Sequence, residues 1–170
     1  FLKSIGVRNY IDKGYVISKL NNIKKKNIYR FKKISVGATI NSILASCLIP
    51  NKIILNNIAT EPEIIDLIKF LKKAGIKIKF LSNRKIEILG KKYLNQISYE
   101  IMPDRIEAGT YMIASAITNS KLTIKKLNIN HVQNTINYLS KANIKVKKID
   151  KNSVQILPGK IKSVSFKTSP

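Results

Sequence analysis

The feature of this sequence that most restricts its fold is an internal repeat. The segment 44–58 aligns with the segment 113–127 at a constant offset of 69 positions. After a slip of one residue, the segment 70–79 aligns with the segment 138–147 at an offset of 68. Self-similarity over such a distance is typical of a chain built from repeated supersecondary units. The two copies are therefore expected to share one fold.

The residue pattern inside each copy predicts a mixed α/β unit. Gly75 and Asn143 occupy equivalent positions after an amphipathic helix, and both residue types tolerate the left-handed conformation that ends helices. Alternating apolar residues then predict hairpins that pair residues 76–80 with 85–89, 144–149 with 153–157, and, earlier in the chain, 7–11 with 15–18. Each unit should run strand, helix, strand, helix, strand, strand. The first strands are expected near Ile28–Phe31, Tyr99–Ile101 and Val164–Lys167.

Three helix starts carry the capping-box pattern, in which a short polar residue is followed three positions later by Glu or Gln. They are Thr60 with Glu63, Asp104 with Glu107, and Asn130 with Gln133. On this reading the chain holds the tail of one unit, two whole units and the first strand of a fourth. A repeat protein that stops within a unit leaves faces unburied, so we expect a piece of a longer protein.

The net charge of +23 raises the question of nucleic-acid binding. Of the 32 basic residues, however, only Arg8, Arg30, Arg84 and Arg105 are arginine. Bidentate recognition of phosphates and base edges favours arginine. Because the lysines are spread along the chain, a solvated lysine-rich surface is the simpler interpretation. A non-catalytic lysine-rich nucleic-acid-binding repeat protein remains as an alternative.

Other classes of protein lack their signature here. No run of eighteen apolar residues predicts a membrane span. The single cysteine, Cys47, excludes an internal disulfide and fits a reducing compartment. Cys47 lies on an apolar helix face and aligns with Ala116, which indicates packing. His131 has no partner at a metal-ligand spacing, and no P-loop, dinucleotide-binding or serine-hydrolase motif is present.

One helix start has the composition of an anion site. Ser35 can cap the helix that follows, and Gly37 would let a ligand approach the backbone. Free N–H groups and the helix dipole favour an anion there, and Lys33 adds a full positive charge. An ordinary N-cap beside an incidental lysine is the alternative. Asp104 with Glu107 could likewise serve general acid–base chemistry, although helix capping explains the pair more simply.

Three motifs resemble those of the enolpyruvyl transferases: "SVGAT" at 35–39, "ATEPEIID" at 59–66 and "MPDRIEAGT" at 102–110. The similarity extends over essentially the whole chain, to "VSFKTSP" at 164–170. It implies an inside-out α/β barrel (a β/α prism) built from repeated βαβαββ units, here incomplete. The complete family fold has six units in two domains, with the active site in the cleft between them. Residues 1–101 would be the C-terminal part of the first domain, and residues 102–170 would begin the second, with a hinge near 101–105.

The same resemblance implies a reaction and its site residues. In the branch of the family that acts on UDP-N-acetylglucosamine, the enolpyruvyl group of phosphoenolpyruvate moves to the sugar 3′-hydroxyl, in the first committed step of peptidoglycan synthesis. The Lys-x-Ser-Val segment of that branch contacts the uridine diphosphate. The matching residues here, expected to bind substrate, are Lys33, Ile34, Ser35 and Val36. Asp104 and Arg105 would lie at the hinge, near the cleft.

No catalytic residue is expected within these 170 residues. The reactive cysteine of the family, which is not Cys47, its arginine-rich loop and its later aspartate all belong to other segments. The resemblance therefore implies a chain that is inactive alone, cytoplasmic, free of metal or organic cofactor, and partnered by the two substrates and the rest of the same polypeptide. The shikimate-pathway enolpyruvyl synthase (3-phosphoshikimate 1-carboxyvinyltransferase) is the second candidate, although it has Ser-Ser-Gln where this chain has Ser35-Val36-Gly37. A decayed gene product that retains the fold stays open as well.

Overall fold

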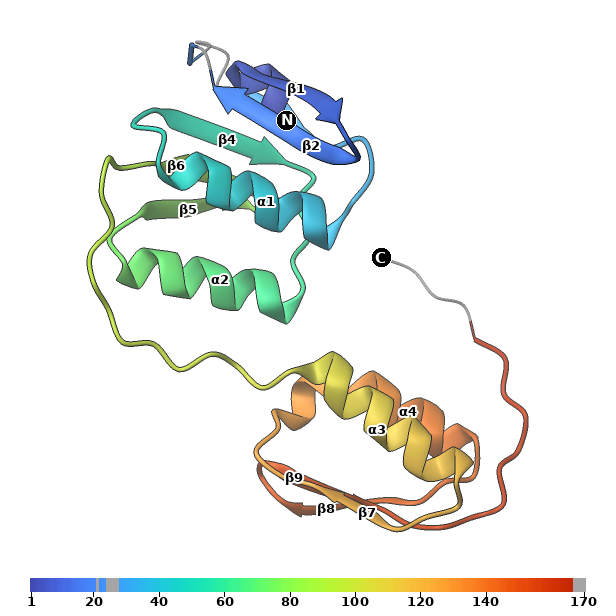
Figure 1. Ribbon diagram of the computed structural model, residues 1–170. Coiled ribbons are helices and arrows are strands. Elements are labelled where there is room, and N and C mark those ends of the chain that lie inside the picture. The colour runs from blue at the N-terminus through green and yellow to red at the C-terminus, as the bar shows by residue number, and fades with distance from the viewer. Residues whose placement is uncertain (21, 24–27, 167–170) are drawn as a thin grey trace. The chain divides into compact units, whose positions relative to one another are not determined.

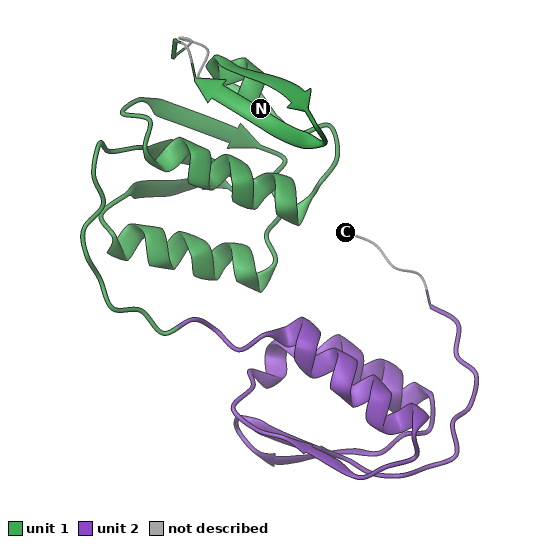
Figure 2. Cartoon of the chain, in the orientation of Figure 1, with its two compact units in different colours: residues 1–100 green, residues 101–170 purple. Residues whose placement is uncertain are grey.

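The computed structural model describes residues 1–20, 22–23 and 28–166. The chain divides into two compact units, residues 1–100 and 101–170 (Figure 2). Each unit has its own cluster of buried apolar side chains. The two units are therefore described one at a time.

The first unit contains a complete strand, helix, strand, helix, strand, strand block. It opens with a 3-10 turn, η1 (Leu2–Ile5), and a separate hairpin of β1 (Val7–Asp12) and β2 (Tyr15–Leu20). The block follows as β3 (Ile28–Arg30), α1 (Val36–Cys47), β4 (Lys52–Asn56), α2 (Pro62–Lys73), β5 (Lys77–Ser82) and β6 (Lys85–Leu89). Its sheet has the order β3-β4-β6-β5, in which β3 and β4 are parallel and the other pairs are antiparallel. The order of elements predicted from the sequence is confirmed.

The sheet of the first unit buries one face because its strands alternate apolar and polar residues. Ile53 of β4 lies opposite Ile88 of β6, and Leu55 lies opposite Ile86, all four side chains being buried. The helices α1 and α2 pack side by side on this face (Figure 1). Ile64, Ile68 and Leu71 of α2 are buried there, as their helical spacing predicts.

The second unit repeats most of this arrangement. Its elements are α3 (Arg105–Ile117), β7 (Leu122–Ile124), the 3-10 turn η2 (Ile129–Val132), α4 (Gln133–Lys141), β8 (Val146–Asp150) and β9 (Ser153–Ile156). The antiparallel sheet has the order β7-β9-β8, and both helices cover one face (Figure 1). Met112 of α3 is fully buried in the core of this unit, together with Ile144, Val154 and Ile156.

The helix ends show that the two copies fold alike. Gly75 and Asn143 have positive φ angles of 94° and 66°, so both adopt the left-handed conformation predicted for them. The amide of Ile76 donates to the Leu71 carbonyl at 3.0 Å, and Ile144 donates to Leu139 at 2.9 Å. This is the hydrogen bond that closes a helix in the Schellman motif. The predicted correspondence between the two segments is confirmed down to single hydrogen bonds.

Two of the predicted first strands were wrong. Residues 99–101 form no strand, and β7 pairs only with β9 among the described residues. Tyr99 is held instead against α2, where its hydroxyl donates to Asp66 at 2.8 Å and its ring packs edge-on to Phe70. Residues 164–166 are also not a strand, and Phe166 packs on Tyr138 of α4; Lys167 lies outside the described residues.

Two of the predicted helix caps were also wrong. The N-cap of α2 is Glu61, not Thr60, because a residue before proline is disfavoured in the helical region and Pro62 is the first helical residue. The second copy has no proline at the equivalent position, and its chain leads into α4 through the turn η2. Asn128, not Asn130, caps that turn by accepting the Asn130 amide at 3.1 Å.

Candidate functional site

The candidate site lies where two helices begin at the same edge of the first sheet. Because β3 and β4 are parallel, their carboxyl ends meet at one edge, and α1 and α2 begin just beyond those ends. Asn57, directly after β4, donates its side-chain amide to the Phe31 carbonyl after β3 at 3.0 Å. Ligands of open α/β sheets commonly bind at such an edge.

The start of α1 has the geometry of an anion-binding turn. Ser35 is the N-cap and accepts the Ala38 amide at 3.2 Å, as predicted. The amides of Val36 and Gly37 make no hydrogen bond to any residue that the structure describes. A side chain at Gly37 would meet no atom within 4 Å, so the space beside this turn is open. Two free N–H donors at a positive helix end are an attractive position for an anion.

The four residues predicted to bind substrate are brought together at this turn. Lys33 is exposed, Ile34 and Val36 are half-buried, and Ser35 presents its hydroxyl to the helix. Ile34 and Val36 pack against the first core, which anchors the turn. Lys33 is therefore free to place its ammonium group beside a bound anion, while its neighbours hold the backbone in place.

The start of α2 lies close to that of α1 and is joined to it by Thr39. The Thr39 hydroxyl donates to the Ser35 carbonyl at 2.8 Å and accepts the Ala59 amide at 3.0 Å. On the α2 side, one carboxylate oxygen of Glu61 is buried without a hydrogen-bond partner in the described ranges. Arg84 donates to the Ile58 carbonyl at 3.1 Å and so supports the same segment.

Sequence reasoning missed Thr39. The signal was present in the repeat, because at the offset of 69 the aligned residue is Ala108. Because the second copy has alanine at this position, the fold that the two copies share does not require a buried polar residue there.

Asp104 and Arg105 lie in the second unit. Asp104 is the N-cap of α3, and one of its carboxylate oxygens accepts the amides of Ile106 and Glu107 at 2.7 and 3.1 Å. The predicted capping role is confirmed. Arg105 is the first residue of α3 and is half-buried. A role for either residue at a hinge stays a prediction.

Two other candidates have structural explanations. Cys47 is buried, its thiol donates to the Ile43 carbonyl at 3.1 Å, and burial raises the pKa of that thiol to about 11. Such a thiol is not a nucleophile at neutral pH, so the packing role predicted for Cys47 is confirmed. The Nε2 atom of His131 lies 3.2 Å from the Asn128 amide nitrogen. No cluster of three metal-ligating side chains occurs in the part of the chain that the structure describes.

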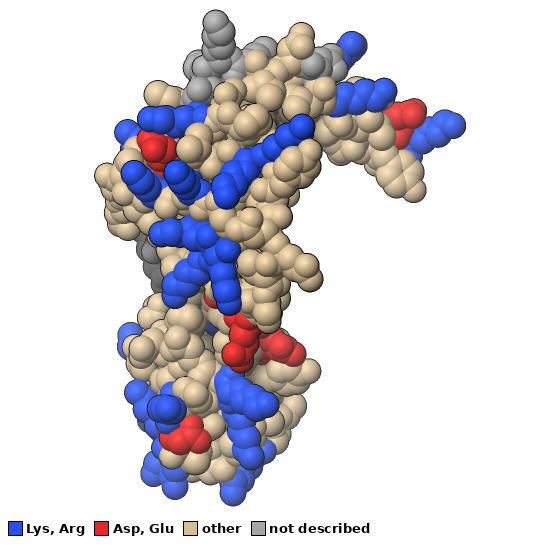
Figure 3. All heavy atoms as spheres, turned by 90° about the vertical axis from the view of Figure 1, so that its left-hand side faces the viewer, with Lys and Arg blue, Asp and Glu red and all other residues tan. Residues whose placement is uncertain are grey.

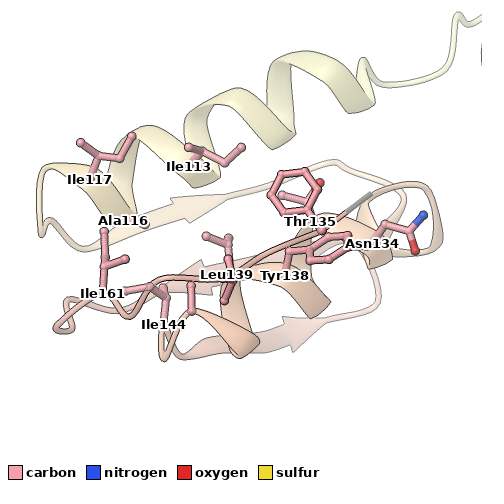
Figure 4. A pocket seen from close by; sticks show the side chains of 12 residues that line it. Ile113, Ala116, Ile117, Asn134, Thr135, Tyr138, Leu139, Ile144 and Ile161 are labelled. Carbon is pink, nitrogen blue, oxygen red and sulfur yellow. The ribbon is translucent and has the colours of Figure 1, made fainter. Parts of the chain in front are cut away.

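A pocket of about 430 Å³ in the second unit has a different character (Figure 4). Ile113 and Ile117 of α3, Leu139 of α4 and Ile161 border it, and the polar side chains that line it among residues 28–166 are Asn134, Thr135 and Tyr138. No charged residue of that range lines it. The pocket is therefore unsuited to a nucleotide diphosphate. Among the described residues, no helix is long and apolar enough to cross a membrane.

Basic residues are spread along the whole sequence. Figure 3 shows lysine and arginine side chains over both units, separated by uncharged residues and accompanied by a few carboxylates. Lys52 and Glu87 form an ion pair at 3.3 Å. Isolated lysines of this kind attract polyanions in general and read no sequence.

The fold and the helix start define a class of protein: repeated α/β units with an anion-attracting helix start. Comparison with known proteins identifies the family. The model of the family described as EPSP synthase (3-phosphoshikimate 1-carboxyvinyltransferase) matches residues 1–170. The chain belongs to this family.

Curated relatives include the UDP-N-acetylglucosamine 1-carboxyvinyltransferases of Pelagibacter ubique and Rickettsia prowazekii, each 42% identical over 99% of this chain and 40% of the relative. The chain thus spans about 40% of the length of these relatives. Among solved structures, the enolpyruvyl transferase NikO from Streptomyces tendae matches with a TM-score of 0.72 at 16% identity, covering 92% of this chain and 40% of that one. The EPSP synthase from Acinetobacter baumannii matches with a TM-score of 0.57 at 17% identity, covering 91% and 37%. At these identities the structural matches show the shared fold alone.

Proposed function

We propose that this chain is part of an enolpyruvyl transferase that moves the enolpyruvyl group of phosphoenolpyruvate to the 3′-hydroxyl of UDP-N-acetylglucosamine. The observation that carries the proposal is identity of 42% over 99% of the chain to two proteins named for that activity. Phosphate is the other product, and the step commits its acceptor to peptidoglycan synthesis.

In this proposal Lys33, Ile34, Ser35 and Val36 bind the diphosphate of the sugar nucleotide. The support is the open first turn of α1, where the amides of Val36 and Gly37 are free donors and Lys33 is exposed. Charge-assisted hydrogen bonds to phosphate oxygens are about twice as strong as neutral ones. The turn would bind and orient the nucleotide, and the bond-making groups would come from the rest of the enzyme.

The two units would belong to the two domains of the complete enzyme. Residues 1–101 would complete the first domain and residues 102–170 would begin the second, each domain being an inside-out α/β barrel of repeated βαβαββ units. Asp104 and Arg105 would lie at the hinge between them. The apolar residues left exposed on α3, Ile106, Ile113 and Ile117, support a larger assembly of this kind. A cytoplasmic location is part of the proposal and agrees with the single, buried, unpaired cysteine.

A chimaera tests the activity. The matching segment of the Pelagibacter relative is replaced by these 170 residues, and phosphate release is measured with both substrates. We expect release that requires both substrates, and loss of most of it with Lys33→Ala. We also expect the chain alone to release no phosphate. Activity of the isolated chain would contradict the assignment of the catalytic groups to other segments.

The shikimate-pathway activity is a second candidate, because the matching family model carries that name. Its acceptor, 3-phosphoshikimate, has one phosphate and no nucleotide. Titration of the chain with UDP-N-acetylglucosamine, 3-phosphoshikimate and an RNA oligonucleotide separates the candidates. Binding of the first that survives about 0.2 M salt supports the proposal, since nonspecific phosphate contacts weaken steeply with salt. Preference for either of the others would replace it.

A further inference from the structure

We infer that Thr39 is a positioning residue for the proposed nucleotide site, an inference that rests on the proposed function. Its side chain is fully buried, so it acts without touching the ligand. Its hydroxyl joins the first turn of α1 to the segment that leads into α2, and the two helix starts are held as one rigid edge.

The hydrogen bonds of Thr39 are well placed for this role. The hydroxyl donates at 2.8 Å to the Ser35 carbonyl, which belongs to the same peptide group as the free amide of Val36. It accepts from the amide of Ala59, which is also fully buried, at 3.0 Å. A buried amide that loses its acceptor costs more than the hydrogen bond contributes, so the Ala59 segment is strongly tied to this hydroxyl.

The fold itself does not require the link. In the second unit, Ala108 stands in place of Thr39, and α3 still forms, with its N-cap Asp104 at the position equivalent to Ser35. Asn128 aligns with Ala59, and its side chain caps its own turn by accepting the Asn130 amide at 3.1 Å. The link is therefore found in the copy that carries the Lys33–Val36 turn and is replaced in the other. A difference of this kind between two copies of one fold points to a requirement of the site.

The consequence for binding follows from rigidity. A diphosphate must meet the amides of Val36 and Gly37 with good geometry, because hydrogen bonds weaken steeply when the angle departs from linear. The Thr39 hydroxyl holds the peptide group that carries the Val36 amide and directly precedes that of Gly37. Without it the turn keeps its charge and its donors but loses its fixed orientation relative to the α2 segment.

The experiment uses the ¹⁵N-labelled 170-residue chain and three variants. Thr39→Val keeps the shape and removes both hydrogen bonds, Thr39→Ala copies the residue of the second unit, and Thr39→Ser keeps the hydroxyl. Ser46→Ala is the matched control, because Ser46 is another fully buried hydroxyl of α1 but donates only to Ser42 of the same helix, at 2.6 Å. Amide hydrogen exchange is measured at Ala59, with Ile88 as the reporter of general stability. UDP-N-acetylglucosamine is then titrated into each protein.

We expect Thr39→Val and Thr39→Ala to speed exchange at Ala59 about tenfold beyond any change at Ile88, and to weaken UDP-N-acetylglucosamine binding by about tenfold. Thr39→Ser should restore both, and Ser46→Ala should change neither beyond its effect at Ile88. Exchange at Ala59 that merely follows Ile88, or unchanged nucleotide binding in both variants, would overturn the inference while the proposed function stands. Absence of binding to the unmodified chain would overturn the proposed function first, and the positioning role with it.

Discussion

The repeat allows one core substitution to be made twice, at equivalent places in two separate cores. Ile88 of β6 and Ile156 of β9 lie at the offset of 68 and are both fully buried. Each occupies an inner strand of its sheet, Ile88 between Ile53 and Ile78, and Ile156 between Leu122 and Val146. Ile88→Ala and Ile156→Ala remove the same three carbon atoms.

The cost can be worked from that geometry. Three buried carbon groups account for about 2.4 kcal/mol at ~0.8 kcal/mol each. A residual cavity of roughly 50 Å³ raises this to about 3.5 kcal/mol. Ile53 is only 2% exposed, whereas Leu122 is half-buried, so the second site can relax and should cost about 0.5–1 kcal/mol less. A unit of 70 residues has an unfolding free energy of about 3.5–10 kcal/mol, so Ile156→Ala should remove a large part of that free energy.

Urea unfolding followed residue by residue with ¹⁵N NMR is the assay. Ile88→Ala should lower the unfolding free energy reported by amides of residues 1–100, and Ile156→Ala that reported by residues 101–166. The Ile→Val variants should cost about 1 kcal/mol each, and Ile149→Ala, at an exposed position of β8, should cost almost nothing. Equal shifts of all amides in both variants, or a cost below about 1 kcal/mol at Ile88, would refute the reasoning from two separate cores.

Three further predictions concern single groups. A side chain at Gly90 would lie within 3 Å of the carbonyl oxygens of Ser46, Cys47 and Ile49, so Gly90→Ala should destabilise the first unit by about 3 kcal/mol or more in thermal unfolding. At Gly37 the added methyl group would meet no atom, so Gly37→Ala should leave stability unchanged but weaken nucleotide binding. Equal losses of stability in the two variants would contradict the geometry. The hydrogen bond to the Asp66 carboxylate, helped by burial, raises the pKa of Tyr99, so its ring should titrate in ¹³C NMR above the usual value near 10. The folded state holds this proton more tightly, so the associated stability is lost as the pH rises through the raised pKa, and Asp66→Asn should reduce the shift. Ser35→Asp should keep α1 capped with unchanged or slightly higher thermal stability but abolish UDP-N-acetylglucosamine binding; retained affinity would show that the anion does not lie at this helix start.

The sequence was informative wherever the chemistry is local. Gly75 and Asn143 were identified as left-handed helix ends because few residue types tolerate that conformation, and both have positive φ. Ser35 and Asp104 were identified as caps because a short polar side chain before an apolar helix has one common use, and both accept helix amides. The hairpins followed from alternation of apolar residues.

The sequence predictions were wrong where the local structure is determined by contacts between distant residues or by a neighbouring proline. Tyr99 was expected in a strand, but its hydroxyl and ring find Asp66 and Phe70, which lie some thirty positions earlier in the chain. No pattern in the neighbouring residues predicts these contacts. Thr60 had the sequence of a cap, yet Pro62 moved the helix start by one residue because it restricts Glu61. The Thr39 link joins residues twenty positions apart and was visible only through comparison of the two copies.

That comparison separates what the fold requires from what a site requires. Ser46 and Ser115 are buried in both copies, and Gly75 and Asn143 both end their helices, so these positions serve the common architecture. At the helix starts the copies differ in charge. A carboxylate at Asp104 satisfies the first amides of α3 and repels any further anion, whereas Ser35 caps one amide of α1, leaves two free and is preceded by Lys33. The two helix starts thus differ in electrostatics, and the difference supports the proposed diphosphate site at α1. The second copy therefore serves as a negative control for that proposal within the same chain.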